Sequence, residues 1–348
     1  MTSTHDRARA ALEALSDLSP EYGPQLTDHA PMVVEALERI EPSAIEPFLA
    51  RTLPRLRPLD REPDPALHAF AASARLVAQG LERDGADHVL EETAPALGRS
   101  VAGAAFHGII RIAHALRGLD RDPHPTRRAE LARALTYAAV RADVLPQRPL
   151  ARARDTLTLG EALARLSPAP DALEPRPGLI TPTLVARAAA HPELGTISAA
   201  LRREGEPVER ARALRREAAS LLTRGEHAKT TTFTLLHAVT GAEAVLTLAR
   251  KLSAERAHEL VDEGAHALLA MRVAFVGRLD RPLVAAPPWR ELVTRAVTSL
   301  DDHAIKLAAA MEDDEGLDDD VRRAALWAWL ERVEGESARA PSPRDRAS

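Results

Sequence analysis

The chain contains 348 residues, of which 45% are hydrophobic and 28% charged, and its net charge of −5 is ordinary for a globular protein. Arg and Asp/Glu are interleaved along the chain rather than sorted into blocks, which argues against a nucleic-acid-binding surface. The chain has no cysteine, which rules out disulfides, thiolate ligands and a cysteine nucleophile. Any metal must therefore be held by nitrogen or oxygen ligands.

The residue pattern predicts an all-α fold. Ala, Leu, Arg and Glu dominate, period-2 runs of Val, Ile and Thr are lacking, and proline-marked loops separate the apolar periodic segments. We expect one large multi-helix domain over residues 1–333 with a central cavity. The predicted helices span 28–40, 45–56, 65–83, 87–98, 103–119, 126–145, 182–190, 195–203, 208–223, 227–250, 254–276, 287–299, 301–311 and 318–333.

Two segments are predicted to lie outside this regular pattern. Residues 146–182 are rich in proline and predict a long internal connection with one short helix near 157–166, and residues 334–348 predict a disordered tail. The N-terminus lacks a basic region followed by an apolar one, and no apolar run approaches the roughly 20 residues needed to span a membrane. We therefore expect a cytoplasmic protein with neither membrane nor nucleic-acid partners.

Four histidines lie in apolar helical sequence. His29, in LTDHAPMVVEAL, falls at a helix start, where the plainer interpretation is a capping or surface residue beside Asp28. His237, in TTTFTLLHAVTGAEAV, has no carboxylate within a turn on its own face. A buried imidazole at that position must find a partner from another helix or a metal ion.

The segment GAAFHGIIRIAHALRGL carries His107, Arg111 and His114 at i, i+4 and i+7, on one helical face. Two histidines at that spacing lie about 10 Å apart along the helix axis, so at most one of them can bind a given ion. Gly108 weakens the helix locally but permits close approach of another helix or a ligand. The alternative is a pair of hydrogen-bonded core histidines.

The segment SLDDHAIKLAAAM places His303 and Lys306 at i, i+3 on one face. Burial of a lysine ammonium among Ile, Leu and Ala is unfavourable unless the group is paired or neutral. The alternative is a lysine whose ammonium reaches solvent from a partly exposed helix.

Taken together and in order, these four segments resemble the questin oxidase-like proteins over roughly residues 25–312. The resemblance also includes RRAELARALTYAAVRADVLP, which follows the second motif. It implies a non-haem Fe(II) site, with His29, His107, His237 and His303 matching the motif histidines and Lys306 matching a lysine that can be carboxylated. Imidazole ligands suit iron, and a carbamate would turn a buried cation into an anionic oxygen ligand.

The resemblance further implies an O2-dependent mono- or dioxygenase acting on an aromatic or polyketide quinone or ketone, by Baeyer–Villiger-type or ring-cleaving oxidation. An external reductant such as NADPH is expected, and Arg111 and His114 are expected to orient the substrate. Conventional nicotinamide, flavin and nucleotide folds are disfavoured because the chain lacks their glycine-rich signatures.

Two alternatives to an oxygenase stay open from the residues. One is a metal-dependent hydrolase on a helical scaffold, suggested by the Asp28–His29 and Asp302–His303 pairs, although helical phosphohydrolases use the reverse His-Asp order. The other is a non-catalytic helical ligand-binding protein in which the histidines serve packing. Stoichiometric metal, and its loss in His237→Ala, would separate both metalloenzyme hypotheses from the binding protein.

Overall fold

The computed structural model describes residues 3–22, 25–146, 156–174, 179–312 and 316–339. Within these residues the chain forms sixteen α-helices and one antiparallel pair of short strands, β1 (Glu21–Tyr22) and β2 (Leu26–Thr27), so the predicted all-α fold is confirmed. The helices are α1 (Thr4–Ala14), α2 (Ala30–Ile40), α3 (Ile45–Thr52), α4 (Phe70–Asp84), α5 (Ala86–Arg99), α6 (His107–Arg121), α7 (Pro125–Val140), α8 (Leu159–Arg165), α9 (Ile180–Ala190), α10 (Leu194–Ala199), α11 (Pro207–Arg224), α12 (Thr232–Ala249), α13 (Ala254–Phe275), α14 (Trp289–Ser299), α15 (Asp302–Ala310) and α16 (Asp319–Arg339). Short 3-10 turns cover Pro42–Ala44, Leu53–Arg55, Leu59–Arg61, Pro65–Leu67 and Lys229–Thr231.

The observed helices differ from the predicted ranges mainly at their ends. Helix α1 is not among the predicted ranges, although Ser3 and Asp6 form a capping box at its start. Helix α16 continues to Arg339, beyond the predicted end at residue 333, and the rest of the predicted tail lies outside the described residues. The predicted connection over 146–182 contains α8 and the first turn of α9, and its residues 147–155 and 175–178 are also outside the described part.

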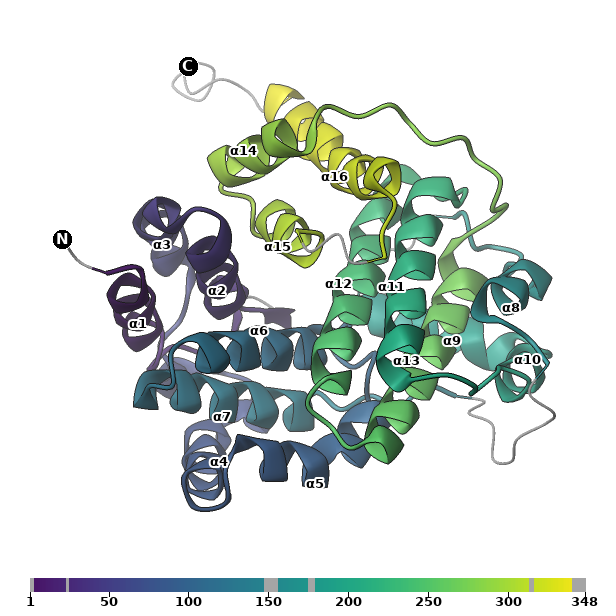
Figure 1. Ribbon diagram of the computed structural model, residues 1–348. Coiled ribbons are helices and arrows are strands. Elements are labelled where there is room, and N and C mark those ends of the chain that lie inside the picture. Colours follow the sequence, from purple (N-terminus) through teal and green to yellow (C-terminus); the bar gives the residue numbers. More distant parts are fainter. Residues whose placement is uncertain (1–2, 23–24, 147–155, 175–178, 313–315, 340–348) are drawn as a thin grey trace.

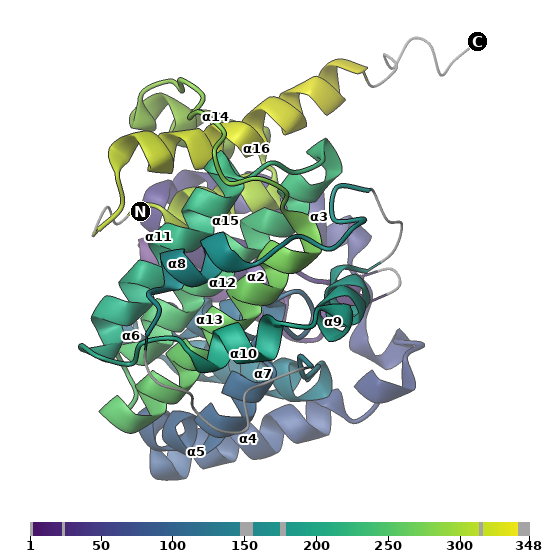
Figure 2. The same ribbon diagram turned by 90° about the vertical axis from the view of Figure 1, so that its right-hand side faces the viewer.

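Helix α12 lies at the centre of the molecule and contacts α6, α11, α13, α15 and α16. The helices α14 and α16 lie together on one side, and α4 and α5 on the opposite side (Figures 1 and 2). The segment Lys229–Ala249 is long and apolar enough by composition to cross a membrane, but 89% of its most apolar window is buried by other helices. That burial is typical of a core helix.

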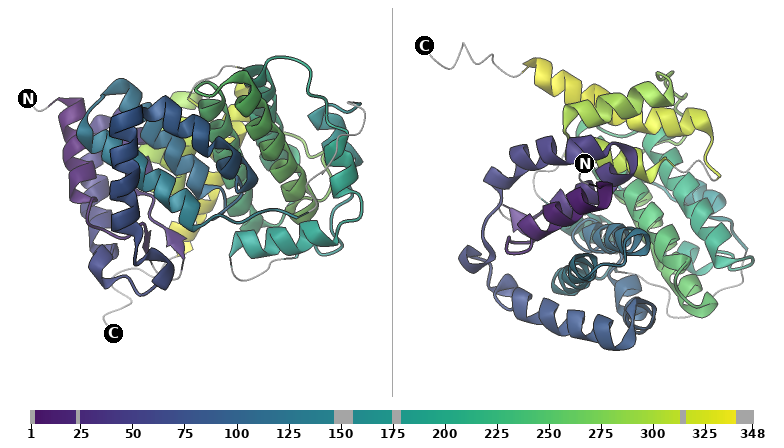
Figure 3. Two further views of the ribbon diagram at one scale, coloured as in Figure 1. Left: turned by 90° about the horizontal axis from the view of Figure 1, so that it is seen from below. Right: turned by 60° about the vertical axis from the view of Figure 1, so that its left-hand side comes forward.

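Two hydrophobic clusters meet along α2 and α15. The smaller cluster joins α1, α2 and α3 on one side of the molecule, away from α8–α10, as Figures 1 and 3 show. It includes Val33 of α2 and Ile305 of α15, whereas the neighbouring Met32 and Ala304 belong to the larger cluster around α6, α12 and α13. Side chains at the start of α2 and α15 are therefore held at the boundary between the two clusters.

Candidate metal centre

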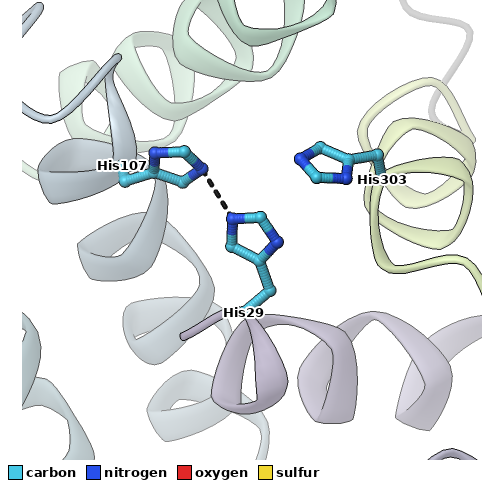
Figure 4. A group of neighbouring side chains, drawn as sticks. All are labelled: His29, His107 and His303. Atoms are coloured by element: carbon cyan, nitrogen blue, oxygen red, sulfur yellow. Dashed lines mark hydrogen bonds between the residues drawn. The ribbon is translucent and has the colours of Figure 1, made fainter. Parts of the chain in front are cut away.

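The four motif histidines come together where α2, α6, α12 and α15 meet. His29 immediately precedes α2, His107 is the first residue of α6, His237 lies in α12, and His303 lies in the first turn of α15. All four are buried, with His237 completely inaccessible to solvent. In Figure 4, the rings of His29, His107 and His303 point from three different helices toward one shared space.

The four imidazoles form a closed ring of neighbours. The centroid separations are 4.7 Å for His29–His107, 4.7 Å for His107–His237, 5.2 Å for His237–His303 and 4.6 Å for His303–His29. The Nε2 atom of His107 lies 2.7 Å from Nε2 of His29 and 3.2 Å from Nε2 of His237. Two imidazoles on one ion, with bonds of about 2.1 Å, place their nitrogens roughly 2.8–3.4 Å apart, so these separations are close to those of a metal site.

The outward-facing nitrogen of each ring has an oxygen neighbour. Nδ1 of His107 lies 2.5 Å from the carbonyl oxygen of Ala104, and Nδ1 of His237 lies 2.6 Å from that of Phe233. Nδ1 of His29 and of His303 lie 2.6 Å and 2.8 Å from the two carboxylate oxygens of Asp302. Because these oxygens only accept, each Nδ1 carries the proton and donates it.

The inward-facing Nε2 atoms are consequently unprotonated and present lone pairs to one another. Lone pairs of His29 and His107 at 2.7 Å repel unless a positive charge lies between them. Nε2 of His303 is buried and has no hydrogen-bond partner among the described residues, although buried polar atoms are nearly always paired. A cation between the ring nitrogens of His29, His107 and His303, which all lie within 4.8 Å of one another, would satisfy these three rings, and His237 adjoins them through His107.

A proton is a poor candidate for that cation. Burial, reinforced by the charge of Lys306, lowers the pKa of His29 to about 3. Burial and the neighbouring imidazoles likewise hold the pKa values of His107 and His237 well below the usual range. His29, His107 and His237 are therefore neutral at physiological pH, which is the state in which imidazole binds metals.

Asp302 holds two of the four rings at once. Burial alone would raise the pKa of this carboxyl, but the adjacent His303 and His29 outweigh burial and lower it well below its usual range. A carboxylate that accepts from the far nitrogen of a ligand histidine fixes the ring and its tautomer, as is common around protein-bound metals. This role was missed from the sequence, although the acidic residue directly before His303 is a signal that could have suggested it.

An unusual turn sets the position of His107. Ala104, Ala105 and Phe106 all have positive φ angles, of 46°, 55° and 68°, which cost roughly 1–2 kcal/mol each for residues other than glycine. The predicted helix start at Gly103 is therefore wrong, and α6 begins only at His107. The turn is held by the Thr181 hydroxyl, which accepts from the amide of Ala105 at 2.9 Å.

Two glycines next to the cluster permit close packing. A methyl group on Gly108 would lie 3.0 Å from Cβ of Ala138, so the glycine lets α6 approach α7. A methyl group on Gly241 would lie 2.7 Å from the ring of Phe106, so this glycine accommodates the residue that precedes His107. The predicted close approach at Gly108 is thus made by another helix.

Lys306 is buried on the same face of α15 as His303, with 1% of its surface exposed. Burial lowers its pKa to about 8, an effect that Asp302, Asp301 and Asp28 only partly offset. The charge of Lys306 in turn contributes to the lowered pKa values of His29, His107 and His237. The alternative of a lysine that reaches solvent is excluded.

Arg111 and His114 have partners away from the cluster. The Arg111 guanidinium donates two hydrogen bonds to Glu130 of α7, at 2.7 and 3.1 Å. Nδ1 of His114 donates to the Glu35 carboxylate of α2. Both side chains therefore join α6 to neighbouring helices, and only His107 of the two α6 histidines belongs to the cluster.

A small cavity borders the cluster. It has a volume of about 50 Å³ and is lined by Tyr22, Asp28, His29, Arg51 and Asp302, among others. A water molecule needs roughly 10–15 Å³ of such space, so the cavity suits a few small molecules rather than a polycyclic compound. The expected central cavity is thus small where it meets the histidines.

No protein-family model matches this sequence, and no curated protein matches it either.

Proposed function

We propose that His29, His107, His237 and His303 bind one Fe(II) ion and that the protein is an O2-dependent oxygenase of the questin oxidase-like kind. The observation that carries the proposal is the convergence of four buried imidazoles whose Nδ1 atoms all lie against oxygens. Their free Nε2 atoms face one another without a proton to separate them. Imidazole donors suit iron, although zinc, copper and nickel accept the same donors.

Other residues of the chain would hold the histidine rings and complete the ligand set. The Ala104 and Phe233 carbonyls and the Asp302 carboxylate hold the rings, so the site is organised before an ion arrives. The Lys306 amine adds to CO2 and releases a proton, which gives a carbamate whose oxygen completes the ligand set. A bound Fe(II) supplies the capacity to bind and activate O2.

The reaction proposed is oxidation of an aromatic or polyketide ketone or quinone, with an external reductant such as NADPH, in the cytoplasm. The cavity of about 50 Å³ beside His29 and Asp302 admits O2 or water. A polycyclic substrate requires the surrounding helices to move before it can contact the cluster.

Oxygen uptake tests this proposal. Protein loaded anaerobically with Fe(II) and desalted is mixed with O2, NADPH and a panel of quinones and cyclic ketones. We expect substrate-dependent O2 consumption that His237→Ala abolishes and that His266→Ala retains, because His266 is an equally buried histidine outside the cluster. If the iron-loaded protein consumes no O2 with any compound, the oxygenase assignment fails even if iron is bound.

A hydrolase has less support than an oxygenase. Asp302, the carboxylate next to the cluster, has both of its oxygens on histidine Nδ1 atoms rather than free to bind an ion. Phosphomonoester turnover by Mn- or Zn-loaded protein would reverse this preference.

A further inference from the structure

A second and larger cavity lies against helix α16. Its volume is about 880 Å³, within the usual range of sites for organic ligands. Its walls are the end of α11, the turn Lys229–Thr231 before α12, the segment joining α13 to α14, and α16. That segment is tied to α11 by the Arg281 amide, which donates to the Arg224 carbonyl, and to α16 by Arg323, which donates to the Ala286 carbonyl.

The charge of this cavity favours an anion. Its lining includes four permanent cations, Lys229, Arg278, Arg281 and Arg332, and two carboxylates, Glu226 and Glu331, so the balance is 4 − 2 = +2. The Glu226 carboxylate accepts from the backbone amide of Arg278 at 3.3 Å and lies 3.6 Å from Nε of the same residue, so these two charges offset each other and the balance rests on Lys229, Arg281 and Arg332 against Glu331, 3 − 1 = +2. A positive cavity in a chain of net charge −5 concentrates anions locally.

Aromatic rings connect one wall of the cavity with the cluster. Trp327 lines the cavity directly. The Arg332 guanidinium lies 5.0 Å from the ring centroid of Trp329 and 5.9 Å from that of Phe233. Those two rings pack on His303 with centroid separations of 5.5 and 4.9 Å. One layer of aromatic side chains therefore separates the cavity from the histidines.

We propose that this cavity binds a planar organic anion, with its charged group at Lys229 and the arginines and its ring against Trp327. Cationic and aromatic groups on facing walls suit a molecule that has a flat apolar body and a carboxylate at one end. The site is distinct from the histidine cluster because Phe233 and Trp329 lie between them. The inference goes beyond the oxygenase proposal and does not depend on it, since binding here needs no metal.

The test compares two probes of the same shape, anthraquinone-2-carboxylate and its uncharged carboxamide, by equilibrium dialysis against metal-free protein. We expect the carboxylate to bind roughly tenfold more tightly, which corresponds to about 1.4 kcal/mol, and its affinity to fall as salt is added. Lys229→Gln should weaken carboxylate binding about three- to tenfold and leave carboxamide binding unchanged.

Lys251→Gln is the matched control, because Lys251 pairs with Asp120 away from the cavity. It should leave both affinities unchanged. Acetylation read by mass spectrometry adds a site-resolved measurement, since the chain has only three lysines and the carboxylate should protect Lys229 but not Lys251.

Equal affinity for the two probes, or equal loss in the two lysine variants, would overturn the inference. The outcome of this test does not depend on whether the proposed oxygenase function is correct. Carboxylate binding by a protein that takes up no iron upholds the cavity and refutes the metal site, whereas iron uptake without carboxylate binding does the reverse.

Discussion

Two histidines of one helix, His107 and His114, are equally buried but are satisfied in different ways. His114 donates to Glu35, which also accepts from Arg121 at 2.7 Å and lies near Arg117, so its surroundings contain both signs of charge. The Nε2 of His107 faces only other imidazoles, and no carboxylate of the described residues lies against that atom in the hydrogen bonds seen.

The difference separates a structural network from a binding site. Around Glu35, the protein supplies both signs of charge, because the carboxylate accepts from His114 and Arg121 and lies 3.6 Å from Nε of Arg117. Burial would raise the pKa of Glu35, but Arg117, His114 and Arg121 outweigh it and keep this carboxyl ionised. Around His107, the protein fixes the rings but leaves their Nε2 lone pairs for a metal ion, which the chain does not itself supply. Four measurements test this contrast.

The largest effect is expected from Glu35→Ala. It leaves the buried His114 without its carboxylate and also removes a partner of the partly exposed Arg121, and we expect a loss of about 3–5 kcal/mol in the free energy of unfolding by urea. Iron bound per folded chain should not change. Glu334→Ala, which breaks an exposed pair with Arg295, is the control and should cost less than about 1 kcal/mol. Similar losses in the two variants would show that the Glu35 network is not structural.

Metal-dependent stabilisation should be confined to the cluster. At a free Co(II) or Fe(II) concentration a thousandfold above the dissociation constant, the wild type should gain about 4 kcal/mol of unfolding free energy. His107→Ala should gain none, because it removes the ring that touches two others. His114→Ala should lose stability without metal yet keep the gain. A gain that survives in His107→Ala would place the ion elsewhere.

A smaller effect is expected from Asp302→Asn. The amide oxygen can accept from only one of His29 and His303, and the amide nitrogen opposes the other ring. We expect metal affinity to fall about 10- to 100-fold in a chelator competition titration. Asp301→Asn is the comparison, because Asp301 caps α15 through the Ala304 amide and should affect stability rather than affinity. An unchanged affinity in Asp302→Asn would show that the carboxylate does not organise the rings.

The smallest effect concerns pH in the metal-free protein. His29 has an ordinary pKa of 6.5, lowered by burial to about 3 in the folded protein, so below pH 6.5 the unfolded chain binds a proton that the folded chain does not. Stability should be unaffected by His29 above that pH and fall by about 1.4 kcal/mol per pH unit below it, down toward pH 3. His29→Asn should show a slope shallower by that amount, measured by urea unfolding between pH 7.5 and pH 5.5 (chosen to span about one unit below the ordinary pKa). Identical slopes would mean that His29 is already charged in the folded state.

Most of the helical architecture follows from local signals. The apolar periodicity and proline positions predict α9, α11, α13 and α14 to within a few residues. The turn at Ala104–Phe106 could not be predicted, because Ala and Phe have no local preference for positive φ and the turn is stabilised by a distant side chain, Thr181. Tertiary contacts override local propensity there.

The candidate site was predictable in its members but not in its connections. The spacing argument allowed only one of His107 and His114 at a single ion, and the structure brings only His107 into the cluster. The hydrogen bond between His29 and Asp302 joins residues 273 positions apart, and no local sequence pattern predicts such a contact. The same limit explains why Arg111 and His114 looked available for a substrate, since their partners Glu130 and Glu35 lie on other helices.

The central claim is that the four histidines hold one metal ion, and iron analysis by plasma mass spectrometry tests it most directly. Wild type, His237→Ala and His266→Ala are loaded anaerobically with Fe(II), desalted and measured beside their protein concentrations. We expect about one iron per chain in the wild type and in His266→Ala, because a single site with nitrogen ligands holds one ion, and none in His237→Ala. Iron that is absent from the wild type, or retained in His237→Ala, would contradict it.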